Sequence, residues 1–105
     1  MKEITGKLVG ANEISEDTTL NGMLLGPVIV LNSSNFIISG MVVGSLHLKE
    51  GTKTSIRGTV NGDVFNQGGK LEVFGTVDGT INNQRGELFV DPDANVGKIV
   101  DSLTG

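Results

Sequence analysis

The fold is decided by a nine-residue stretch that the chain repeats. Ile56-Arg57-Gly58-Thr59-Val60-Asn61-Gly62-Asp63-Val64 returns 17 residues later as Val73-Phe74-Gly75-Thr76-Val77-Asp78-Gly79-Thr80-Ile81. In both copies, apolar residues stand two before the first glycine, two after it and two after the second glycine, which is the side-chain period of a β-strand. A repeat of about 17 residues is too short for a helix pair or a propeller blade, but it matches one coil of a β-solenoid.

The same pair of glycines recurs along the whole chain. The second glycine of each pair stands at positions 10, 26, 44, 62, 79 and 97, in steps of 16, 18, 18, 17 and 18 residues. We therefore predict an all-β fold, a single-stranded parallel β-helix of about six coils of 16–18 residues, with residues 1–105 forming one domain. Glycine is expected at the corners between short strands because sharp corners need backbone angles that residues with a Cβ resist.

Branched aliphatic residues follow the glycine spacing in three columns, which we expect to face a common core, because each coil of a solenoid buries its inward residues against its neighbours. The columns are Ile4, Leu20, Ile38, Ile56 and Val73; Leu8, Leu24, Val42, Val60, Val77 and Val96; and Val28, Leu46, Val64, Ile81 and Ile99, with Asn12 interrupting the third. Asn66 and Asn83 occupy equivalent places in successive coils and predict a ladder of amide hydrogen bonds.

The outward positions differ between the two halves of the chain. If side chains alternate, apolar residues face outward in the second and third coils, at Met23, Leu25, Ile29, Leu31, Met41 and Val43. The positions equivalent to Met23 and Leu25 are polar in the fourth and fifth coils, where they are Thr59, Asn61, Thr76 and Asp78. An exposed apolar patch usually marks a partner surface, so we expect these six residues to form a lateral contact or to bind another protein.

Parallel coils also leave unpaired strand edges at both ends of the stack, and unprotected edges tend to pair. We expect end-to-end association through Ile4 and Leu8 at one end and through Val90, Val96, Ile99 and Leu103 at the other.

We expect neither catalytic residues nor a metal or cofactor site, and hence no enzyme. The single histidine, His47, lies between two inward-facing leucines and should point to solvent, and the chain has no cysteine. A net charge of −4 argues against binding nucleic acid or anionic lipid, and no membrane association is expected. Met1-Lys2-Glu3-Ile4 leads into the first coil without an apolar signal region, so we expect a cytoplasmic protein.

Three segments resemble parts of the bactofilins, a family of bacterial cytoskeletal proteins. Gly58-Thr59-Val60-Asn61-Gly62-Asp63-Val64 and its repeat at residues 75–81 are similar to the G-x-V-x-G-[DN]-I coils of that family, and residues 88–97 resemble its closing coil. The resemblance implies a right-handed, three-sided β-helix that polymerises end to end, without nucleotide, into filaments or scaffolds. Right-handed crossovers are also the general rule for parallel strands.

Two other interpretations remain open. A small binding module, such as an inhibitor, an immunity-type protein or an adaptor, would use the apolar patch to capture one partner. An enzyme of the left-handed hexapeptide acyltransferase type would account for the six-residue spacing of Leu24, Val30, Phe36, Val42 and Leu48, but the 17-residue step after Gly62 breaks that register.

Overall fold

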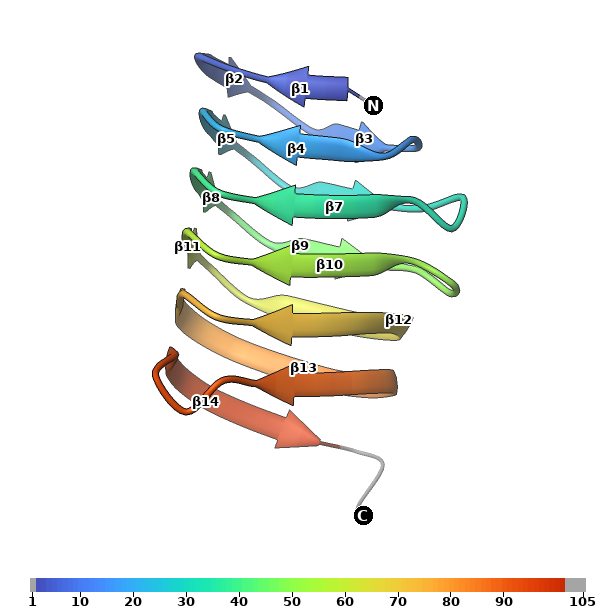
Figure 1. Ribbon diagram of the computed structural model, residues 1–105, viewed down its shortest axis with the longest axis vertical. Coiled ribbons are helices and arrows are strands. Elements are labelled where there is room, and N and C mark those ends of the chain that lie inside the picture. The colour runs from blue at the N-terminus through green and yellow to red at the C-terminus, as the bar shows by residue number, and fades with distance from the viewer. Residues whose placement is uncertain (1, 102–105) are drawn as a thin grey trace.

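The computed structural model describes residues 2–101, which form six coils stacked along one axis (Figure 1). Each coil has three strand segments, and all of the strand pairs are parallel. The predicted all-β, three-sided parallel β-helix of six coils is therefore confirmed.

Short strands build the first three coils and the start of the fourth. They are β1 (Lys2–Ile4), β2 (Lys7–Val9), β3 (Asn12–Ile14), β4 (Thr18–Leu20), β5 (Met23–Leu25), β6 (Val28–Val30), β7 (Asn35–Ile38), β8 (Met41–Val43), β9 (Leu46–Leu48), β10 (Lys53–Ile56) and β11 (Thr59–Asn61). The last three strands bend around corners and are correspondingly longer. They are β12 (Val64–Val73), β13 (Thr76–Val90) and β14 (Asn95–Asp101).

Three parallel faces result from the stacking. Face A holds β1, β4, β7, β10 and the final segments of β12 and β13. Face B holds β2, β5, β8, β11 and the first segments of β13 and β14. Face C holds β3, β6, β9, the first segment of β12, the middle of β13 and the end of β14.

The coils wind in the right-handed sense. In Figure 1 the near strands of face A run from right to left and the far strands of face C run from left to right, while the chain descends from β1 to β14. A path that turns clockwise as it moves away from an observer at the N-terminal end is a right-handed helix. The left-handed acyltransferase fold is therefore not the fold of this chain.

The core is built from the predicted columns. Residues such as Leu20, Ile38 and Ile56 lie in register on face A and are fully buried. A second inward column on the same face places Phe36 between Thr18 and Thr54. The two threonines are also buried, and their small side chains leave room for the phenylalanine ring in a close-packed core.

Glycines occupy the corners for two different physical reasons. Gly44, at the corner between faces B and C, has a φ of 135°, which an L side chain rarely adopts. Gly58, at the corner between faces A and B, has no such angle. A Cβ there would instead overlap the carbonyl oxygen of Gly40 in the coil above and lie 2.7 Å from that of Ser39. The expectation of special backbone angles is right for Gly44 and wrong for Gly58, where the close approach of coils excludes a side chain.

The predicted amide ladder is present inside the rod. The Nδ2 of Asn66 donates to the Oδ1 of Asn83 at 2.9 Å and to the carbonyl oxygens of Gly69 and Glu87, each at 3.2 Å. The Oδ1 of Asn66 accepts from the Gly69 N–H at 2.9 Å. Because Asn66 is fully buried, these bonds satisfy polar groups that water does not reach.

No helix long and apolar enough to cross a bilayer is found in the part of the chain that the structure describes.

Replacing Gly58 by alanine should destabilise the fold by about 3 kcal/mol, because the added Cβ forces two coils apart in a close-packed stack. Chemical denaturation followed by circular dichroism measures the change in the free energy of unfolding. The control is Asn61→Ala, at an exposed position of face B, which should change that free energy by less than about 0.5 kcal/mol. Equal stability of the Gly58→Ala variant and the wild type would contradict the close contact between corners.

Candidate assembly surfaces

The N-terminal end of the rod is an open strand edge. Within residues 2–101, β1, β2 and β3 pair only with β4, β5 and β6. Two predicted contact residues lie here and differ in exposure. Ile4 is only 7% exposed and forms the top of the face A core, whereas Leu8 is 43% exposed on face B. Val9, beside Leu8, is 77% exposed.

The C-terminal end is likewise open within residues 2–101, since β14 pairs only with β13 and the last segment of β13 pairs only with β12. Among the predicted contact residues, Val90 and Val96 are half-buried against the core, and Ile99 is 45% exposed. Leu103 lies outside the described residues. Phe89 and Val100 point to the exterior of this last coil and are 48% and 40% exposed.

Sequence reasoning missed Val9, Phe89 and Val100 as residues of the two ends. In an alternating pattern they read as ordinary outward positions, and their exposure arises because they stand in the first or the last coil. A signal was available nonetheless. Phe89 and Val100 are apolar residues at outward positions of a C-terminal half whose other outward positions are mostly polar.

Charge is distributed unevenly along the rod. Coil 1 with its exit loop carries Lys2 and Lys7 against Glu3, Glu13, Glu16 and Asp17, and coil 6 carries Lys98 against Glu87, Asp91, Asp93 and Asp101. The coils between them carry five basic and four acidic residues. Both ends are therefore acidic, although the middle of the rod is nearly neutral.

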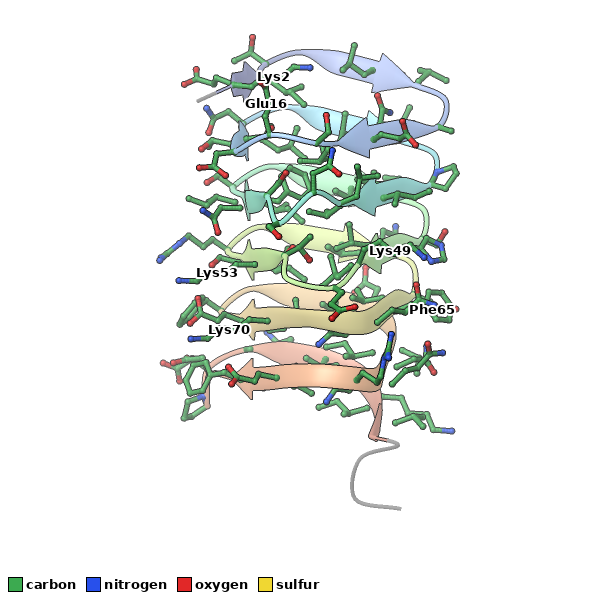
Figure 2. The ribbon with its side chains drawn as sticks, turned by 90° about the vertical axis from the view of Figure 1, so that its right-hand side faces the viewer. Lys2, Glu16, Lys49, Lys53, Phe65 and Lys70 are labelled. Atoms are coloured by element: carbon green, nitrogen blue, oxygen red, sulfur yellow. The ribbon has the colours of Figure 1, made fainter. Side chains whose placement is uncertain are left out.

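Figure 2 looks onto the corner between faces C and A and shows where some of these charges lie. Lys53 lies above Lys70 on one side, Lys49 lies on the other, and Lys2 and Glu16 lie near the N-terminal end.

The predicted lateral patch is divided between two faces. Met23, Leu25, Met41 and Val43 form a block of four on the exterior of β5 and β8, where Met23 is in register with Met41 and Leu25 with Val43. Ile29 lies on β6, on the exterior of face C, and Leu31 follows that strand. All six side chains are half-buried, because neighbours in the ladder cover part of each.

Val9 extends the block on face B, since it is in register with Leu25. We call Val9, Met23, Leu25, Met41 and Val43 the apolar strip. Toward the C-terminal end, the same two ladders continue in coil 4 with the polar residues Thr59 and Asn61, so coil 3 is the last coil of the strip.

His47 contacts neighbouring side chains on face C. Its ring stacks on Phe65 with centroids 5.0 Å apart and planes 10° apart. Its Nε2 lies 3.2 Å from the Oγ of Ser45. Burial, with a smaller contribution from the positive charge of Lys49, lowers the pKa of His47 below 6.5. No group of three or more histidine, cysteine, aspartate or glutamate side chains suited to a metal ion occurs among residues 2–101.

Comparison with known proteins gives no relative from which a function could be transferred: no protein-family model, curated protein or solved structure matches this chain.

The pKa of His47, measured by NMR titration of its ring protons, should lie below 6.5 and rise when Lys49 is replaced by glutamine. Because the folded-state pKa is lower than the unfolded one, the unfolded chain binds the proton more readily. Stability should therefore be complete above pH 6.5 and decrease as the pH falls toward the folded pKa. A folded-state pKa at or above 6.5 would show that the ring is neither desolvated nor affected by Lys49.

Proposed function

We propose that this protein is a structural, self-assembling protein whose rods join end to end into filaments or scaffolds, the C-terminal coil of one copy meeting the N-terminal coil of the next. The role proposed is mechanical rather than catalytic, its site is the cytoplasm, and assembly needs no nucleotide or other cofactor.

One observation carries this proposal. The large apolar side chains that are exposed within residues 2–100 are Leu8, Val9, Phe89, Ile99 and Val100, and all five stand in coil 1 or coil 6. Apolar surface that gathers at both ends of a rod, beside unpaired backbone, favours association there. A monomeric solenoid commonly caps its terminal repeats with polar surface.

Continuing the stack would match inward columns across the junction. On face A, the column that descends to Val90 would continue at Ile4 of the next copy. On face B, the column that descends through Val77 to Val96 would continue at Leu8. Both junctions place apolar residues together, as inside the rod. On face C, Ile99 would meet Asn12, which makes that side of the junction less apolar.

A contact between two different ends does not close on itself. Such a head-to-tail interface extends without limit when successive copies are related by translation along the axis. The resemblance of residues 58–64 and 75–81 to bactofilin coils supports end-to-end assembly, because that family polymerises end to end.

A second function is favoured by the apolar strip. A binding module, such as an adaptor or an inhibitor, would present Met23, Leu25, Met41 and Val43 to one partner protein, and its rods would remain monomeric. The state of assembly of the purified protein separates the two functions.

Two variants that each block one end should dissect the assembly. Leu8→Asp places a charge on the N-terminal end and Ile99→Asp on the C-terminal end, and each should abolish filaments in negative-stain microscopy while circular dichroism remains unchanged. Mixed at equal concentrations, the two variants should form a one-to-one dimer and nothing longer, because one intact N-terminal end meets one intact C-terminal end.

Asn32→Asp is the matched control, since it adds the same charge at an exposed corner in the middle of the rod, where φ is 59° and aspartate is tolerated. It should form filaments as the wild type does. Dimers of Leu8→Asp alone or of Ile99→Asp alone would point to contacts between like ends, and a wild type that stays monomeric at high concentration would remove the proposal.

Salt should promote end-to-end assembly, because both end coils carry excess negative charge. Raising the ionic strength from about 0.01 M to about 0.1 M shortens the screening length from about 30 Å to about 10 Å and weakens that repulsion. Sedimentation should show a several-fold lower critical concentration at the higher ionic strength. If filaments dissolve instead, attraction between charges holds the junction, and the apolar contact is not the main one.

A further inference from the structure

The apolar strip on face B is unusual for its lack of charge. The three segments that form this face and its corners in coils 1–3 are residues 5–11, 21–27 and 39–45, and Lys7 is the only charged residue in them. The protein as a whole carries a net charge of −4. Two copies therefore meet less electrostatic repulsion at this strip than at the acidic ends of the rod.

The strip is too small to hold two free molecules together. Three strands about 4.8 Å apart, each three residues long at about 3.3 Å per residue, give roughly 140 Å² of flat surface. A stable complex buries about 800 Å² on each partner. A partner that uses this strip must therefore offer it many times over, so that weak contacts add up through multivalency. A filament of this chain presents one strip in every subunit.

The strip is also complementary to itself. A two-fold axis that lies between β5 and β8, parallel to the strands, brings Met23 opposite Met41 of the second copy and Leu25 opposite Val43. The same rotation brings Lys7 opposite the hydroxyl-bearing Thr59, and Val9 opposite Asn61, so no two charges of the same sign meet. Methionine side chains adapt their shape to the surface that they contact, which suits a contact between two identical faces.

We propose that the apolar strip pairs two filaments side by side, in antiparallel orientation, through face B of each. The proposal rests on end-to-end assembly, since single rods lack the area to pair. Each subunit has one such strip, so a filament that has paired with a second filament has no strip left to bind a third. The expected product is a two-filament ribbon of uniform width rather than an open-ended bundle.

The test compares three proteins by negative-stain microscopy under conditions of filament formation. The wild type should give ribbons of two filaments. Leu25→Asp should give single filaments at an unchanged critical concentration, because the substitution lies outside the end contacts. Asn32→Asp, which carries the same added charge away from face B, should still give ribbons. Ribbons formed equally by Leu25→Asp, or a wild type that forms only single filaments, would overturn the pairing.

A second measurement remains decisive if the rods do not assemble end to end. Ile99→Asp, which blocks the C-terminal end, is coated densely on beads through a tag at the C-terminus, so that the beads supply the multivalency. Light scattering should show that these beads cluster, and that beads carrying Ile99→Asp with Leu25→Asp do not. If beads with the intact strip stay dispersed, the pairing is refuted whether or not filaments form. If beads carrying Leu25→Asp cluster equally well, the contact lies on another surface.

Discussion

The structure depends on one constraint: an inward side chain in a narrow coil is buried by the coils above and below it. A coil of 16–18 residues encloses too little volume to form a core of its own. Leu46 on face C is fully buried because Val28 and Val64 stand in register on either side of it. The terminal coils lack one of these neighbours, which is why Leu8 and Ile99 remain exposed although their columns are buried elsewhere. The same constraint thus produces both the buried interior and the apolar side chains that are exposed at the two ends.

Much of the fold follows from the sequence because the period of two and the step of about 17 residues act together. The columns through Ile38, Val42 and Leu46 could be assigned to the interior without knowledge of the coil's shape, and their registers agree. The three-sided cross-section was available only through the resemblance to bactofilins, since alternation does not show where a coil bends. The role of Gly58 could not be read from the sequence either, because the clash with Gly40 depends on the spacing between coils.

The lateral surface shows the same limit more clearly. Met23 and Ile29 are both outward-facing apolar residues of the second coil, and in the sequence they belong to one group. The corner at Gly26 separates them onto faces B and C. Alternation predicts whether a side chain points inward or outward, but the placement of corners determines which outward residues share a flat surface. The place of Val9 beside Leu25, by contrast, does follow from the sequence, because each stands three residues after the first glycine of its coil, and the register of β2 with β5 agrees.

One inward column of face C changes its chemistry halfway along the rod. It runs from Ile14 through Val30 and Leu48 to Asn66 and Asn83, so apolar side chains give way to hydrogen-bonded amides. Coils that resemble one another could stack out of order while the protein folds, and hydrophobic contact alone would tolerate the slip. A slip by one coil would set an asparagine amide among aliphatic side chains and leave a buried polar group unsatisfied, at a cost of about 1–3 kcal/mol. The asparagine amides therefore help to fix the register in which the coils stack, because only the correct order of coils satisfies their hydrogen bonds.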